Sequence, residues 1–227
     1  MQRYSLIHEK MPREFVLLQS KGCKWGKCTF CDYHLDRNSA PFETNRLVLE
    51  KVTGVYGVLD VINSGSAIEL DSQTIDLINA IVEEKHIHTL WFEMHYMFRE
   101  QLEDFAKLFP RVRVKFRCGI ETFDAELREK WNKGVAKDVT AKDVARYFQG
   151  VCLLIGTKGE TKERIQRDIE LAQRYFEYFS VNLFCNNTTQ VKRDEELALW
   201  FEKEIYPQIK DNPKVEVLLN NLDLGVG

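Results

Sequence analysis

Short apolar runs alternate with amphipathic stretches along most of the chain. The apolar runs predict buried strands over residues 15–18, 58–62, 89–94, 112–120, 151–155, 181–184 and 215–219. Between them, apolar residues at helical spacing predict helices over 71–84, 98–108, 124–131, 143–148, 162–177 and 195–209. Thr161 is expected to cap the helix that begins at residue 162.

The alternation of strands and helices predicts an α/β fold with a parallel sheet, because each helix returns the chain to the same end of the sheet. Six or seven such units predict a partial or compact barrel of the (β/α)6 type, and a doubly wound sheet is the alternative. The chain has no low-complexity tract or linker, so residues 1–227 are expected to form a single domain.

The composition narrows the class of protein. Hydrophobic residues make up 44% and charged residues 30%, and 32 Lys and Arg against 35 Asp and Glu give a formal net charge of -3. This balance argues against binding a long nucleic acid. No apolar run approaches the roughly 20 residues that span a bilayer. Residues 1–12 lack a secretory signal pattern, and six cysteines then suggest the reducing cytoplasm.

Three of the six cysteines lie within nine residues. Cys23, Cys28 and Cys31 follow the first expected strand in a C-x4-C-x2-C spacing. Three close thiolates suit an iron–sulfur cluster, and a four-iron cluster bound in this way keeps one iron for a non-protein ligand. Together with His34, the same thiolates could instead form a Cys3His zinc site. Cys118, Cys152 and Cys185 lie on or beside separate strands and are interpreted as small core residues, with convergence in the barrel lumen as the alternative.

The cysteine loop resembles that of the radical S-adenosylmethionine (SAM) superfamily. That family usually shows C-x3-C-x2-C with an aromatic residue before the last cysteine. Phe30 fills the aromatic position, and one extra residue separates Cys23 from Cys28. Further matches follow in the family's order, at Ser64-Gly65-Ser66, at Glu121, and at Leu154 and Gly156.

The resemblance implies a radical-SAM barrel and a [4Fe-4S] cluster on Cys23, Cys28 and Cys31. It also implies SAM held by the residues that match the family's motifs, which are Phe30, Ser64, Gly65, Ser66, Glu121, Leu154 and Gly156. One electron from a donor such as flavodoxin or ferredoxin then cleaves SAM to a 5′-deoxyadenosyl radical, which takes a hydrogen atom from the substrate.

Polar side chains end or follow the third and sixth expected strands. They suit hydrogen bonds to a small nucleoside-like substrate, although the same residues are common in turns. The expected substrate contacts are Glu93, His95, Asn182, Asn186 and Thr188. Glu93 and Glu121 are the candidates for a catalytic role.

The chain as a whole resembles the queuine lyases of bacterial queuosine salvage. The resemblance lies in the sequence of residues 22–34, the turn at residues 63–66 and the short length of 227 residues. It implies a lyase that releases queuine from queuosine 5′-monophosphate by breaking the C–N glycosidic bond. A radical enzyme on another small substrate, such as a 7-carboxy-7-deazaguanine synthase, is the alternative.

Overall fold

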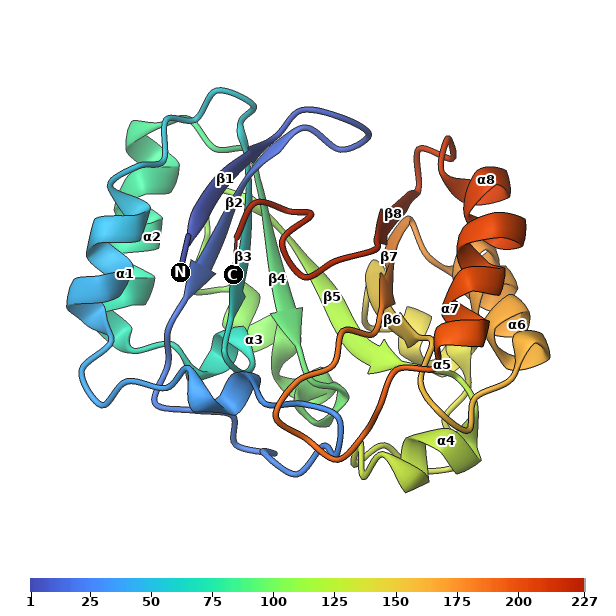
Figure 1. The fold of residues 1–227 in the computed structure, drawn as a ribbon. Coiled ribbons are helices and arrows are strands. Elements are labelled where there is room, and N and C mark those ends of the chain that lie inside the picture. The colour runs from blue at the N-terminus through green and yellow to red at the C-terminus, as the bar shows by residue number, and fades with distance from the viewer. Residues whose placement is uncertain (227) are drawn as a thin grey trace. The chain divides into compact units, whose positions relative to one another are not determined.

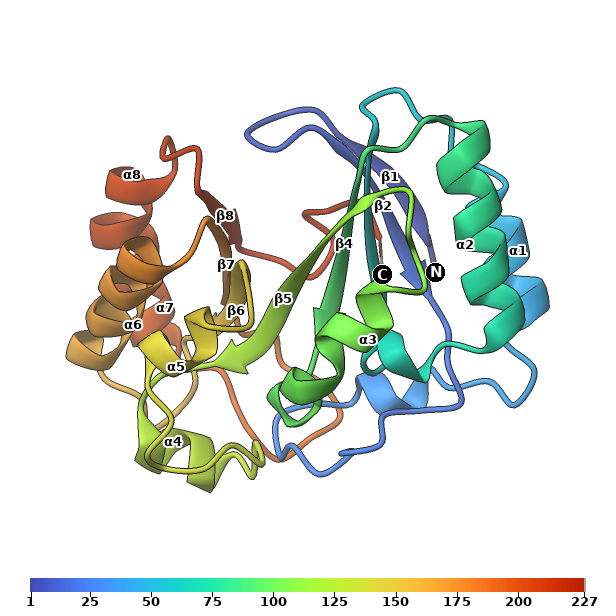
Figure 2. The ribbon, with the colours of Figure 1, turned by 180° about the vertical axis from the view of Figure 1, so that it is seen from behind.

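The computed structural model describes residues 1–226, which form two compact units (Figures 1 and 2). The first unit contains Met1–Gly26, Tyr33–Phe116 and the C-terminal residues from Leu224. The second contains Lys27–Asp32 and Arg117–Asp223. A single domain over residues 1–227 stays a prediction, and residue 227 lies outside the described range.

The sheet of the first unit is mostly parallel. Its strands lie side by side in chain order, and they are β1 (Tyr4–Ile7), β2 (Arg13–Leu18), β3 (Val58–Asn63) and β4 (Thr89–Met94). β1 pairs antiparallel with β2, whereas β2, β3 and β4 are parallel. The helices of this unit are α1 (Phe42–Leu49), α2 (Ser72–Glu84) and α3 (Leu102–Ala106), and α1 and α2 lie side by side (Figure 1).

The second unit also combines a sheet with helices. β5 (Arg113–Glu121) begins in the first unit and ends in the second, where it is followed in the sheet by β6 (Gly150–Ile155), β7 (Tyr178–Leu183) and β8 (Val215–Leu218). β5 to β8 are parallel. The helices are α4 (Ala125–Lys130), α5 (Ala141–Ala145), α6 (Lys162–Tyr175), α7 (Glu195–Trp200) and α8 (Tyr206–Ile209).

The expected strands are all present, and the helices are present with shifted bounds. Thr161 caps α6 as predicted, because its hydroxyl accepts a hydrogen bond from the N–H of Arg164 at 3.3 Å. The helix expected over 195–209 is one run with a π-helical turn, Phe201–Ile205, just before α8. Pro207 in the first turn of α8 lacks an N–H and explains this irregular turn.

Buried polar residues explain why the hydrophobic pattern of the sequence did not predict helix α1 or the first two residues of β2. α1 was not predicted, because Asn45 interrupts its apolar face. The Asn45 side chain is buried and bonds both the N–H and the C=O of Gln19, at 2.7 and 2.9 Å. β2 begins two residues before the expected strand, at Arg13 and Glu14, which are fully buried. Arg13 pairs with Asp60 of β3 at 2.9 Å, so both charges are compensated.

None of the helices among residues 1–226 is long and apolar enough to cross a bilayer.

Candidate active site

The first half of the cysteine loop follows β2 and belongs to the first unit. Gly26 has a φ of +55°, which a glycine adopts without strain. Its N–H points at the sulfur of Cys23, at 3.3 Å from N to Sγ. The loop therefore turns back on the sulfur of Cys23.

The Ser64-Gly65-Ser66 turn after β3 lies against this loop. A Cβ on Gly65 would lie 3.0 Å from the Cα of Cys23, a separation that real side chains rarely show. The hydroxyl of Ser64 lies 3.4 Å from that of Ser20, just before the loop. The structure therefore brings together the cysteine loop and the turn that sequence reasoning assigned to cofactor binding.

Sequence reasoning missed Glu69, which joins these two segments. Its carboxylate accepts hydrogen bonds from the N–H of Ser66, at 2.6 Å, and from the N–H of Lys24. Burial raises the pKa of Glu69, and the two N–H donors offset only part of this effect. The Ser66-x-x-Glu69 spacing of a capping box was the available signal.

His95 connects the same turn to the end of β4. The backbone N–H of His95 donates to the hydroxyl of Ser66 at 2.9 Å, and the ring Nδ1 of His95 accepts from the backbone N–H of Met97 at 3.1 Å. The ring stacks on Trp25 of the lengthened cysteine loop, with centroids 5.8 Å apart. Glu93 is half-buried two residues before His95. Two expected substrate residues thus lie at the end of β4, and one of them touches the cysteine loop.

A basic cavity of about 490 Å³ opens beside Cys23. Its wall includes His34 together with Lys21, Gly22, Cys23, Lys24, Gly26, Arg37 and Glu69. Positive side chains at this point offset the negative charge of thiolate ligands.

The second half of the cysteine loop is anchored within the second unit. Phe30 is buried against Trp131, with ring centroids 5.2 Å apart, and Cys28 and Cys31 pack against the same cluster. The carbonyl of Phe30 accepts a hydrogen bond from Asn187 at 2.7 Å. Phe30 is therefore a packing anchor that fixes the two cysteines on either side of it.

Two of the expected substrate residues brace loops of this unit. Thr188 donates twice to the carboxylate of Asp32, from N–H at 3.0 Å and from its hydroxyl at 2.9 Å. Asn186 accepts from the N–H of Arg193 at 2.9 Å. Asn182 lies on β7, and its buried Oδ1 accepts no hydrogen bond from residues 1–226. Substrate contact by these three residues stays a prediction.

Glu121 ends β5 in a strained conformation. Its φ of +68° is rare for a residue with a side chain, and the pairing of β5 with β6 shifts register between Gly119 and Glu121. The irregularity directs the Glu121 carboxylate to Lys133, at 2.9 Å. Both side chains are nearly buried. Strain of this kind marks functional positions, which supports Glu121 as a site residue.

Lys133 had no sequence signal, since it stands in an Asn-Lys-Gly turn that is typical of a solvated loop. Burial by itself lowers the pKa of Lys133, but the Glu121 carboxylate and, next, the Cys28 thiolate raise it, so the net pKa lies above the ordinary lysine value. Its ammonium group also lies 5.6 Å from the centre of the Phe30 ring. The charged form of Lys133 is therefore favoured beside the second half of the cysteine loop.

The segment after β6 carries the last two expected cofactor residues. Leu154 packs against the Phe30 cluster. Gly156 has a φ of +81°, and a Cβ there would lie 2.6 Å from Leu183. The N–H groups of Gly156 and Thr157 donate to Glu160 at 2.7 and 3.1 Å. Glu160 therefore closes the turn that begins at Gly156.

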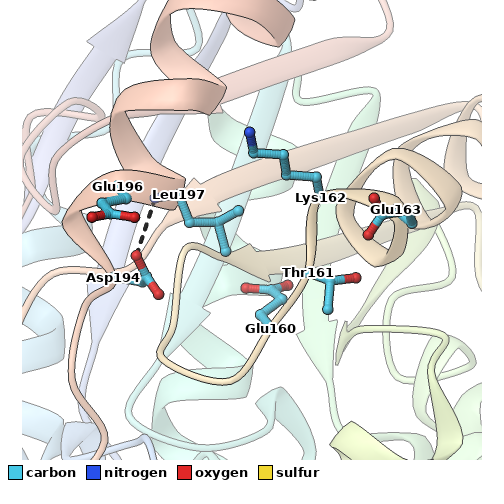
Figure 3. A pocket seen from close by; sticks show the side chains of 7 residues that line it. All are labelled: Glu160, Thr161, Lys162, Glu163, Asp194, Glu196 and Leu197. Carbon is cyan, nitrogen blue, oxygen red and sulfur yellow. Dashed lines mark hydrogen bonds between the residues drawn. The ribbon is translucent and has the colours of Figure 1, made fainter.

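A second cavity, of about 340 Å³, lies where α6 and α7 begin (Figure 3). Asp194 caps α7 by accepting the N–H of Leu197 at 3.1 Å. The other residues around the cavity are Glu160, Thr161, Lys162, Glu163 and Glu196. Carboxylates outnumber the single lysine, so this cavity is unsuited to a phosphate group.

Two of the three isolated cysteines lie in the core as expected, and Cys185 does not. Cys118 and Cys152 are buried, and the half-buried Cys185 directs its thiol to the carbonyl of Leu183 at 3.7 Å. No disulfide links any of the cysteines in the described part of the chain. Nor do any three His, Cys, Asp or Glu side chains among residues 1–226 lie close enough to share one metal ion.

Glu160 predicts a pH-dependent stability. Burial raises its pKa to about 8 from an ordinary value of 4.5, so the folded protein holds a proton that the unfolded chain has lost. This contribution to stability is complete below the pKa of the unfolded chain, 4.5, and is lost as the pH rises through the pKa of the folded protein, about 8. Relative to Glu160→Gln, the wild type should lose about 2–4 kcal/mol of unfolding free energy over this range. Urea denaturation at several pH values measures this loss.

Glu163→Gln is the matched control, because Glu163 lines the same cavity but has a lowered pKa. Its stability should keep the wild-type slope. If the unfolding free energy of Glu160→Gln changes with pH as that of the wild type does, Glu160 is not a buried acid with a raised pKa.

The likeness to solved structures decides the family. No protein-family model and no curated protein sequence matches the chain. The chain is similar to the structure of a queuine lyase from Clostridium spiroforme bound to SAM and queuine. The two are 42% identical, with a TM-score of 0.95, over 100% of this chain and 99% of the other. The chain belongs to the queuine lyases, a family of radical SAM enzymes.

A methylornithine synthase structure shares the fold with this queuine lyase family member. It is 16% identical, with a TM-score of 0.62, over 89% of this chain and 63% of the other. The expected fold, an α/β partial barrel with mostly parallel strands, is therefore confirmed.

Proposed function

We propose that this queuine lyase family member releases queuine from queuosine 5′-monophosphate by breaking its C–N glycosidic bond. The full-length likeness to a structure that holds SAM and queuine carries the proposal. With 42% identity and a TM-score of 0.95 over the whole chain, the fold is shared. The cysteine loop keeps the three cysteines and the aromatic residue of the radical SAM superfamily, with one extra residue between Cys23 and Cys28, and the turn packed against it follows the second expected strand, where that superfamily has a cofactor motif.

The cysteine loop fits a [4Fe-4S] cluster. Cys23, Cys28 and Cys31 are half-buried thiols, with an N–H directed at the first and the Lys133 ammonium group beside the second. A cluster with thiolate ligands is negatively charged, so donors and cations of this kind stabilise it. When bound, the cluster supplies one electron and SAM supplies the group that abstracts hydrogen from the substrate.

Each remaining site residue has a proposed task. Phe30 fixes the two cysteines on either side of it. The Ser64–Ser66 turn holds the methionyl end of SAM, Glu121 its ribose or methionyl end, and Leu154 and Gly156 its adenine. Glu93, His95, Asn182, Asn186 and Thr188 bind the substrate, and Glu93 or Glu121 has a catalytic role. A buried carboxylate such as Glu121 needs a charged partner, and Lys133 is that partner.

The cellular setting follows from the same chemistry. Half-buried thiols that must remain reduced favour the cytoplasm, where we place the enzyme. Reduction of the cluster there requires a one-electron donor such as flavodoxin or ferredoxin. We also propose that the whole chain works as a single catalytic domain.

Product analysis under anaerobic conditions tests the proposal. The protein is incubated with SAM, dithionite and queuosine 5′-monophosphate, and queuine and 5′-deoxyadenosine should form in equal amounts. Omission of SAM is the control and should give neither product. 5′-Deoxyadenosine without queuine would reject this substrate and leave a radical enzyme with another small substrate. A colourless protein that contains zinc and no iron would reject the cofactor.

A further inference from the structure

Glu69 holds two segments of the site with one carboxylate. Its Oε2 accepts the N–H of Ser66 at 2.6 Å, and its Oε1 accepts the N–H of Lys24. Lys24 directly follows Cys23, and Ser66 ends the turn after β3. Each oxygen is thus committed to a different segment, and the span of the carboxylate fixes how far apart the two backbones lie.

The packing around Glu69 leaves little room for adjustment. A Cβ on Gly65 would lie 2.4 Å from Oε2 of Glu69 and 3.0 Å from the Cα of Cys23. The turn, the carboxylate and the cysteine loop are therefore in direct contact. A change in the length of the group at position 69 must move either the turn or Cys23.

The same turn is tied to the end of β4. The hydroxyl of Ser66 accepts the N–H of His95 at 2.9 Å, and the His95 ring stacks on Trp25. The turn thus contacts the cysteine loop at two places, through Glu69 and through His95. Displacement of Glu69 would be transmitted to a residue that we assign to the substrate.

We propose that Glu69 is a positioning residue that sets the distance between Cys23 and the turn that holds the methionyl end of SAM. The inference rests on the proposed function of that turn. Only a carboxylate offers two acceptor oxygens at this span, because an amide has one acceptor and one donor group.

The variant Glu69→Gln tests this assignment. It places an N–H₂ group against a backbone N–H, so one of the two links is lost while the shape is kept. We expect wild-type iron content, an affinity for SAM that is about tenfold weaker, and a smaller change in kcat. Affinity is measured without substrate, from the change that SAM causes in the electron paramagnetic resonance spectrum of the reduced cluster.

Two further variants make each result decisive. Glu103→Gln, an exposed residue of α3, is the matched control and should bind SAM as the wild type does. Glu69→Asp keeps the carboxyl group but is one methylene shorter, so it should retain iron and still bind SAM weakly. Wild-type SAM affinity in Glu69→Gln overturns the proposal. So does loss of iron in both Glu69 variants, because the carboxylate would then serve only to fold the loop.

The spectroscopic readout separates this inference from the proposed function. A wild-type protein that binds SAM but releases no queuine would reject the substrate and leave Glu69 testable. A wild-type protein that releases queuine while Glu69→Gln binds SAM normally would reject the role of Glu69 alone.

Discussion

Replacement of Cys28 by serine is expected to remove the iron and to abolish queuine release. A serine hydroxyl does not ionise near neutral pH, so only two thiolates remain, and these cannot retain a cluster with four iron atoms. The iron and sulfide content should fall from about four atoms of each per chain to nearly none. Activity should fall by on the order of a thousandfold or more, because the cofactor carries the difficult step.

Cys185→Ser provides the matched control. Cys185 is a half-buried thiol of the same unit, and its hydrogen bond to the carbonyl of Leu183 can be replaced by a serine hydroxyl. This variant should keep its iron and its absorption spectrum under anaerobic conditions. Retention of iron and activity by Cys28→Ser would contradict the assignment of the cysteine loop. Loss of iron from Cys185→Ser would mean that Cys185 is a further ligand of the cluster, which neither its spacing nor its geometry indicates.

Asp60→Asn is expected to lower the free energy of unfolding by about 3–5 kcal/mol. Both Arg13 and Asp60 have fully buried side chains, with 2.9 Å between Nε and Oδ2. Removal of the negative charge takes away the carboxylate that is paired with the Arg13 cation, in a medium that solvates the cation poorly. The midpoint of urea unfolding, at an unchanged slope, measures the loss.

An exposed ion pair gives the contrast. Asp104 lies 2.9 Å from Lys107 but is largely exposed. Asp104→Asn should therefore change stability by less than about 1 kcal/mol. The double replacement of Arg13 by Met and Asp60 by Leu should recover most of the loss, because neither charge of this pair then remains without the other. Equal stability of Asp60→Asn and the wild type would contradict a compensated buried pair.

The sequence predicts the strands well because buried parallel strands are continuous apolar runs. It fails where a polar residue occupies a core position. Arg13 and Asn45 look like loop residues until their partners are known, and those partners lie about 26 to 47 residues away. The pairing of distant polar groups is a property of the folded chain, and no local pattern carries it.

The candidate site also contains residues that the sequence indicates and residues that it does not. The cysteine loop could be predicted because three closely spaced cysteines suit a metal cluster, and the Ser64–Ser66 turn because it follows the second expected strand. Their roles in binding the cofactor stay predictions. Glu69 had a weak local signal in its spacing from Ser66. Lys133 had none, since a lysine in a polar turn differs from a surface lysine only through the carboxylate that it meets at 2.9 Å. Positioning residues of this kind become visible only in three dimensions.

The antiparallel strand β1 has a consequence for self-association. It covers the outer edge of β2, from Tyr4 opposite Val16 to Ile7 opposite Arg13. Without it, β2 would present an apolar strand with unpaired backbone groups, which is a template for pairing with a second molecule. β2 leads directly into Cys23, so intermolecular pairing there would distort the metal-binding loop. Loss of β1 should thus lead to aggregation that begins at the strand before the first cysteine.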